Sequence, residues 1–273
     1  MPTRGLSLAG FLDPVSAMNH FRMACVPKDP SDSALMHEWN TAKGMLGPAV
    51  EKAGLPDIRP LPATANDHFH TLRTKWPQWA NVEFVEIEID PLLAFQLTID
   101  CERSEYHCGL LSATPKLVDL LPVCLPTTQS TEDIKASQAL HGQSIVIKSR
   151  SANVRILQQG CFADESKIGV LFGVSAPHAH VVRWQGKCYL HNGFHRALGC
   201  RAAGATHLPC ILRDVESEQE VGFQQGTLTA ALLQSSNPPT VGHFTNNRAY
   251  GVALRKMTKI LHVSWAEHYM PDE

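Results

Sequence analysis

Apolar and polar residues alternate along the stretch VEFVEIEID, residues 82–90. Val85, Ile87 and Ile89 fall on one side of an extended chain, and the acidic residues between them fall on the other side. This period of two residues predicts a half-buried β-strand. The acidic side of such a strand is most often a solvated face, although it can also present a carboxylate to a substrate.

A different period marks the helices. Apolar residues recur at helical spacing over residues 33–53, and Gly47-Pro48 is expected to split or kink that stretch. Shorter helices are predicted at residues 68–79 and 115–121. Further strands are predicted at 144–148 and 153–158, and near the end of the chain where Leu261, Val263 and Trp265 share one face.

The stretch from residue 178 to residue 214 combines both periods. Its hydrophobic spacing changes from two residues to about 3.6 residues at Phe194. Gly204 is expected to stop the helix that begins there. The predicted order is a strand at 178–184, a turn at 185–186, a strand at 187–190, a helix at 194–203 and a strand at 207–213.

These elements predict an α/β (α+β) chain with a mixed sheet and short helices. A length of 273 residues is compatible with one or two domains. We expect a helical N-terminal extension over residues 1–80. The sheet domain is expected over residues 81–273, together with a C-terminal strand extension.

Composition narrows the function classes. The formal net charge is −2, so a chain-wide basic field for nucleic acid is absent, and we expect no sequence-specific DNA binding. No apolar run approaches the ~18 residues of a membrane span, and the first residues do not resemble a signal peptide. The eight cysteines form no CxxC pair. We therefore expect a cytoplasmic protein with free thiols and no membrane partner.

The loop before the 194–203 helix is suited to bind an anion. The first turn of a helix presents unpaired N–H groups and the positive end of the helix dipole. Gly193 allows a ligand to approach the backbone closely. Asn192, His195 and Arg196 add side-chain donors, and a guanidinium matches two phosphate oxygens. The alternative is that Asn192-Gly193 is only a turn, with His195 and Arg196 on a solvated helix start.

A metal site is not expected. His178 and His180 would share one strand face, as some metal ligands do. No second pair at zinc-finger spacing accompanies them. The two histidines are expected to line a pocket or to lie on the hairpin.

The order of strands with NGFHRALGCRAAG between them resembles the ParB/sulfiredoxin-like superfamily. Gly193, Arg196, Gly199 and Gly204 fill the positions of its signature, in which alanine usually stands at the third place. The resemblance covers roughly residues 168–215, with residues 83–96 as an early strand. It implies a loop that binds nucleotide phosphates, with ATP or CTP and Mg²⁺ as the expected cofactors.

The chain departs from the patterns of three members of that superfamily. Phe194 stands where sulfiredoxins have their catalytic cysteine, which argues against sulfinic acid reduction. Asn192 stands where free-serine kinases have an aspartate. Residues 215–273 lack the helix-turn-helix pattern that follows in chromosome-partitioning proteins.

Two functions follow. One is a phosphoryl-transfer or nucleotide-hydrolysing enzyme, with Asn192, Gly193, His195 and Arg196 on the phosphates. His195 and one of Glu86 and Glu88 are its candidate catalytic residues. The other is a non-catalytic module that binds nucleotide or nucleic-acid phosphate. Residues 1–80 are a candidate surface for a protein partner in either case.

Overall fold

The computed structural model describes residues 2–25, 30–47, 54–128, 135–138, 144–149, 154–162, 167–174, 177–223 and 228–266. Helices and strands are mixed along the chain, and the sheets contain parallel and antiparallel pairs, so the fold is α+β, as predicted. Contacts divide the chain into two units. The first comprises residues 1–127 and 178–256, and the second comprises residues 128–177 and 257–273.

This division differs from the boundary expected at residue 80. Residues 1–80 belong to the same unit as the sheet domain, and they include strands as well as helices. The N-terminal strand β1 (Thr3–Ser7) explains why. It pairs with β5 (Thr98–Asp100) on one side and with β13 (Tyr250–Leu254) on the other, which joins three distant parts of the chain.

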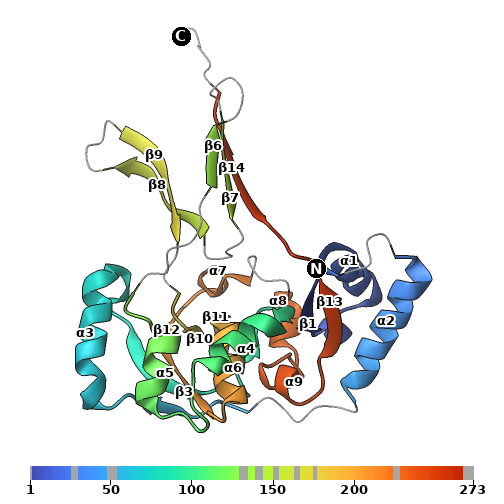
Figure 1. The fold of residues 1–273 in the computed structure, drawn as a ribbon, viewed down its shortest axis with the longest axis horizontal. Coiled ribbons are helices and arrows are strands. Elements are labelled where there is room, and N and C mark those ends of the chain that lie inside the picture. Colours follow the sequence, from blue (N-terminus) through green and yellow to red (C-terminus); the bar gives the residue numbers. More distant parts are fainter. Residues whose placement is uncertain are drawn as a thin grey trace. The chain divides into compact units, whose positions relative to one another are not determined.

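The main sheet of the first unit has the strand order β2-β3-β12-β10-β11-β4 (Figure 1). β10 and β11 form the predicted hairpin, and β12 runs parallel to β10. The strands are β2 (Ile58–Pro60), β3 (Glu83–Glu88), β4 (Leu93–Ala94), β10 (His180–Trp184), β11 (Lys187–Asn192) and β12 (His207–Asp214).

Helices cover this sheet and contribute to one continuous hydrophobic core. α5 and α6 pack against β12, α4 packs against α6, and Phe69 of α3 stacks on Phe84 of β3 with ring centroids 4.7 Å apart. The elements are α3 (Asn66–Lys75), α4 (Cys101–Gly109), α5 (Leu117–Cys124), α6 (Phe194–Ala202), α7 (Glu218–Val221), α8 (Ala230–Gln234) and α9 (Gly242–Thr245), with 3₁₀ turns η2 (Ala63–Ala65) and η3 (Pro77–Trp79).

A smaller core forms beside β13. It contains buried residues of α1 (Pro14–Ala24), α2 (Asp32–Met45) and the 3₁₀ turn η1 (Ala9–Phe11). Asp13 and Ser31 cap the two helices by accepting hydrogen bonds from backbone N–H groups at 3.0 and 3.3 Å. Because these caps satisfy orphan donors, they fix where each helix begins.

The predicted elements between residues 178 and 214 are confirmed in order and type. The helix predicted at 33–53 ends at Met45, before Gly47-Pro48. The N-terminal extension was expected to be helical, and it contains the strand β1 as well as α1. α4 was also missed, because its sequence CERSEYHCG has few apolar residues to mark a helical face.

The second unit consists of two small sheets. One has the order β14-β7-β6 and the other pairs β8 with β9. The strands are β6 (Lys135–Gln138), β7 (Ser144–Ser149), β8 (Val154–Phe162), β9 (Lys167–Val174) and β14 (Lys259–Ser264). In the part of the chain that the structure describes, no helix is long and apolar enough to cross a membrane.

Candidate functional site

Gly193 forms the turn between β11 and α6. Its φ of +100° lies in the left-handed region, where residues with a side chain are strained. A β-carbon there would also lie 3.0 Å from the Cα of Ala179. The register of the β10–β11 pair shifts between His180 and Val181, leaving His191 as an extra residue just before the turn. The local structure therefore requires glycine at this position, independently of any ligand.

His195 lies in the first turn of α6 and is largely buried. Its Nε2 accepts a hydrogen bond from the backbone N–H of Asp100 at 3.1 Å. Nε2 is thus unprotonated, and Nδ1 holds the ring hydrogen. Burial, with the nearby charge of Arg103 as a second cause, lowers the pKa of His195 to about 4. His195 is neutral at pH 7, and the expected acid–base role through Nε2 is not favoured by this arrangement.

Arg196 also points into the protein. Burial lowers the pKa of its guanidinium, and the neighbouring charge of Arg103 lowers it further. Among the described residues, its Nε has no hydrogen-bond partner and is fully buried. A buried guanidinium N–H without an acceptor is costly, so this geometry calls for an anion or another acceptor. A solvated helix start, the alternative for Arg196, does not describe this environment.

Helix α4 adds one positive side chain, Arg103, and one buried histidine, His107. Arg103 is exposed and lies close enough to lower the pKa of both Arg196 and His107. Burial is the main cause that lowers the pKa of His107 to about 4. Within the described segments, the Nδ1 of His107 is buried without a partner. We name the four residues Arg103, His107, His195 and Arg196 the α4–α6 cluster.

Close packing of two helices brings the α4–α6 cluster together. Gly199 of α6 faces α4, and a β-carbon there would lie 2.8 Å from the Cβ of His107 and 2.9 Å from the backbone nitrogen of Cys108. The superfamily signature usually has alanine at this position. Glycine allows α4 to approach α6 more closely than alanine would. This close approach places Arg103 and His107 near Arg196.

The structure does not bring the other predicted catalytic residues to this loop. Asn192 of β11 pairs with His180 of β10, which pairs with Ile211 of β12. Ile211 pairs in turn with Phe84 of β3. β3 is therefore three strand spacings, about 14 Å, from β11. Glu86 and Glu88 lie further along β3, half-buried.

Glu88 also has a structural partner. Its Oε2 accepts the backbone N–H of Asp57 at 3.2 Å, which holds the start of β2. A carboxylate that does lie beside the α4–α6 cluster is Asp100, whose charge partly opposes the lowering of the His195 pKa by burial and by Arg103. One of its oxygens caps α4 by accepting from the N–H of Glu102.

His178 and His180 do not form a metal site. His178 Nδ1 accepts from Trp79 Nε1 at 2.9 Å, and its Nε2 contacts the carbonyl of Pro126 at 3.0 Å, so both ring nitrogens are used. His180 packs against Trp79 and His191, each with ring centroids 5.5 Å away. No group of His, Cys, Asp or Glu side chains able to hold a metal ion occurs among the described residues.

The seven cysteines whose side chains the structure describes are free, as predicted, and the side chain of Cys161 lies outside the described residues. Cys124 of α5 and Cys200 of α6 have their sulfur atoms 3.5 Å apart in the core. Burial raises the pKa of the Cys124 thiol well above its usual value. These two thiols pack beside Arg196 but are unreactive in this environment.

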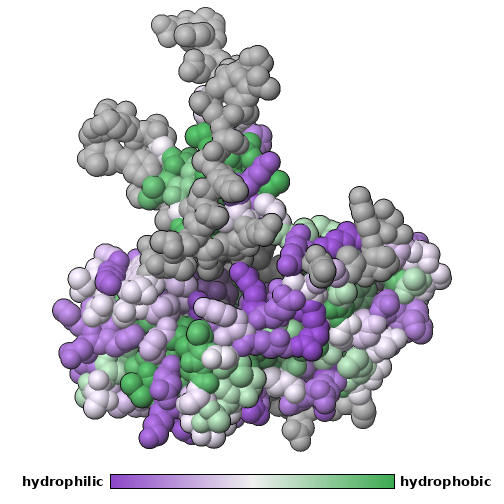
Figure 2. All heavy atoms as spheres, viewed as in Figure 1, coloured by the Kyte–Doolittle hydropathy of each residue, from purple (hydrophilic) through white to green (hydrophobic). Residues whose placement is uncertain are grey.

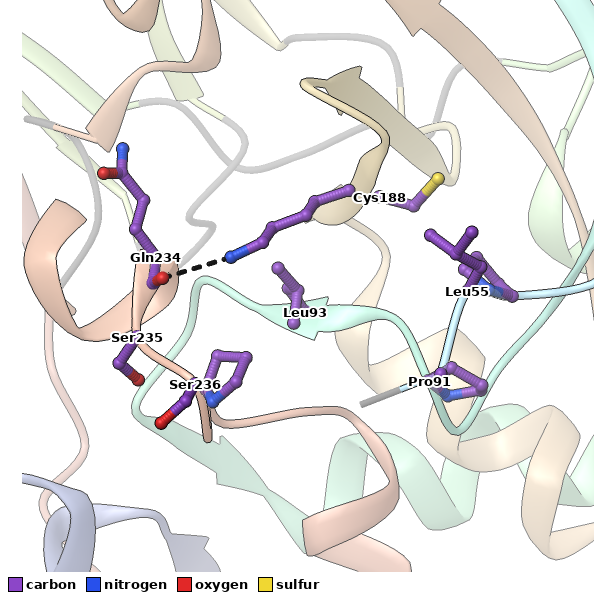
Figure 3. A pocket seen from close by; sticks show the side chains of 11 residues that line it. Leu55, Pro91, Leu93, Cys188, Gln234, Ser235 and Ser236 are labelled. Carbon is purple, nitrogen blue, oxygen red and sulfur yellow. Dashed lines mark hydrogen bonds between the residues drawn. The ribbon is translucent and has the colours of Figure 1, made fainter. Parts of the chain in front are cut away.

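Two pockets are formed entirely by other described residues. One, of about 390 Å³, lies by β4 and the segment that follows α8 (Figure 3). Lys187 is one of its lining residues and donates to the carbonyl of Gln234 at 3.2 Å. The other, of about 570 Å³, lies between β1, α4, α6 and α9. Neither is lined by the loop residues Asn192, His195 or Arg196.

No family model, curated protein or solved structure matches this chain. The site therefore rests on its own geometry. Sequence analysis correctly placed Gly193, His195 and Arg196 at the start of one helix. It did not identify Arg103 and His107, because they lie in a short polar segment roughly 90 residues earlier. No pattern in that segment marks it as a neighbour of the loop.

Proposed function

We propose that this chain binds the phosphate groups of a nucleotide, ATP or CTP, at the α4–α6 cluster. The observation that supports this most strongly is the buried Nε of Arg196, which has no partner among the described residues and lies beside a second arginine, Arg103. Two guanidinium groups repel each other unless an anion lies between or beside them. Phosphate oxygens are the acceptors that such paired guanidinium groups bind best.

Three further features support a phosphate over a single carboxylate. Arg103 and Arg196 lie in the first turns of α4 and α6, so two helix dipoles add positive potential beside them. His195 Nδ1 and His107 supply neutral donors at pH 7. The resemblance to the ParB/sulfiredoxin-like superfamily independently predicts a phosphate at the Gly-x-x-Arg loop.

Binding is the function that this geometry supports best, because Glu86 and Glu88 lie on another part of the sheet. Phosphoryl transfer or nucleotide hydrolysis is the second candidate, and Asp100 favours it. One of its oxygens remains for a Mg²⁺ ion bound to the phosphates. In that mechanism Arg103 and Arg196 would neutralise the charge on the phosphates.

The test is calorimetric titration of the chain with ATP, CTP, their diphosphates and inorganic phosphate, with and without Mg²⁺. Arg196→Ala and Arg103→Ala are each expected to weaken nucleotide binding by about 10- to 150-fold, because a hydrogen bond to a charged group contributes ~1.5–3 kcal/mol. Arg196→Lys restores only part of this loss.

Arg22→Ala is the matched control, because Arg22 is paired with Asp32 on the surface of α1 and α2. Unchanged nucleotide binding in a folded Arg196→Ala protein would reject the site. Product analysis after incubation with the bound nucleotide separates the two functions. Turnover that is lost in Asp100→Asn, with binding retained, would identify an enzyme.

A further inference from the structure

The larger pocket lies on the opposite side of α4 from Arg103. It is an open pocket bordered by β1, β5, α4, α6 and α9, with a volume of about 570 Å³. Pockets that bind small organic molecules typically measure ~300–1,000 Å³. Every residue that lines it is described, and none belongs to the α4–α6 cluster.

The interior surface of this pocket is mainly apolar. Leu6, Ile99, Leu198 and Phe244 line it, and the last three are almost fully buried. Such a surface favours the body of an aliphatic or aromatic ligand, because its burial removes apolar area from water. A polyphosphate, by contrast, would have to lose its hydration without gaining apolar contacts.

Charged groups lie at the edge of the pocket. Arg4 pairs with Glu105, and Arg201 binds both oxygens of Asp90 through its Nε at 3.1 Å. Each arginine is thus neutralised by a carboxylate, so the edge has little net charge. Arg201 makes its described hydrogen bonds through Nε alone, which leaves its two terminal NH₂ groups as donors in a fixed orientation.

We propose that this pocket binds a small monocarboxylate with an apolar body, of the size of a medium-chain fatty acid. The apolar part fills the pocket and the carboxylate accepts hydrogen bonds from Arg201. Because each arginine at the edge is already paired with a carboxylate of the chain, the pocket favours a ligand with one negative charge over a ligand with several. This site is distinct from the proposed phosphate site and does not depend on it.

Cysteine protection tests the proposal directly. Cys101 and Cys108 line the pocket and are partly exposed, whereas the other five described cysteines are buried. In a Cys161→Ser protein, the rate of N-ethylmaleimide addition at Cys101 and Cys108 is followed by peptide mass spectrometry. Decanoate is used below its micelle concentration, and at ten times its Kd both rates are expected to fall about tenfold.

Comparison ligands and variants make the outcome specific. Decanol lacks the carboxylate and should protect far less, and ATP should not protect at all. Ala202→Phe fills the pocket and Arg201→Gln removes the fork, so each should reduce protection by decanoate. Absent protection, equal protection by decanol, or full protection in a folded Ala202→Phe protein would overturn the proposal. If Ala202→Phe does not fold, the comparison of decanoate with decanol still decides.

Discussion

Gly199 on α6 packs directly against His107 on α4, so closely that a β-carbon on Gly199 would lie 2.8 Å from the Cβ of His107. The backbone carbonyl of Ser104 would lie at the same 2.8 Å distance. Real β-carbons do not approach backbone atoms this closely, so a methyl group here must separate the two helices. That separation would move Arg103 and His107 away from Arg196.

Gly199→Ala is therefore expected to destabilise the chain by about 1–3 kcal/mol, the usual cost of overpacking. It should also weaken nucleotide binding, although Gly199 touches no ligand in our proposal. Gly44→Ala is the matched control, because Gly44 is in α2 with nothing within 4 Å of an added β-carbon. Gly44→Ala should stabilise by up to about 1 kcal/mol. Urea unfolding of both variants measures the difference, and equal effects would contradict the packing argument.

Arg196→Met should stabilise the ligand-free chain. Burial lowers the pKa of Arg196, and no acceptor for its Nε exists in the described residues. Replacing it with an unbranched apolar side chain removes that cost while filling the same space. We expect a gain of roughly 1 kcal/mol, or about 2–4 °C in Tm for a chain of this size. A large loss of Tm would mean that Arg196 is a structural anchor and would count against a ligand role.

Trp79→Phe should destabilise more than Trp76→Phe. Both indoles contact the ring of His178, with centroids 6.1 and 4.6 Å away respectively. Only Trp79 donates its N–H to Nδ1 of that ring in the described contacts. Its loss leaves a buried acceptor unpaired, at a cost of about 1–3 kcal/mol. Thermal melts of the two variants, compared with the wild type, measure this difference, and a larger loss in Trp76→Phe would refute it.

Acid should destabilise the fold through His180. Burial lowers its pKa from 6.5 to about 3. The folded state keeps this ring neutral, while the unfolded chain takes up a proton below pH 6.5. The contribution of the neutral His180 ring to the free energy of unfolding is therefore fully present above pH 6.5. Between pH 6.5 and 3 it falls by about 1.4 kcal/mol per pH unit.

His180→Phe removes this contribution and keeps an aromatic ring against Trp79. Free energies of unfolding measured between pH 5 and 7 should show a smaller slope in the variant, and the difference should grow to about one proton near pH 5. Identical slopes in the two proteins would show that His180 is protonated in the folded state.

The surface over α5 differs in hydrophobicity from the surface over α4. Hydrophobic residues gather over α5, where Val118 is 70% exposed, while hydrophilic residues cover the neighbouring α4 (Figure 2). The exposed polar surface of α4 is what hid this helix from sequence analysis.

The amino-acid sequence by itself determined the hairpin, the loop, α6 and β12, together with the glycine that begins the helix. These features depend on contacts between near neighbours, so periodicity and turn residues are sufficient to predict them. The same holds for the acidic strand β3 and for the end of α2 before Gly47-Pro48. The α+β class follows from the order of such local elements.

Only the tertiary structure decided which distant residues meet. Arg103 and His107 reach Arg196 because α4 packs against Gly199, and Glu86 and Glu88 remain apart because two strands separate β3 from β11. The pairing of β1 with β5 and β13 likewise joins residues far apart in the chain. Helix packing and strand order arise from contacts at large sequence separation, and no local pattern of apolar and polar residues records them.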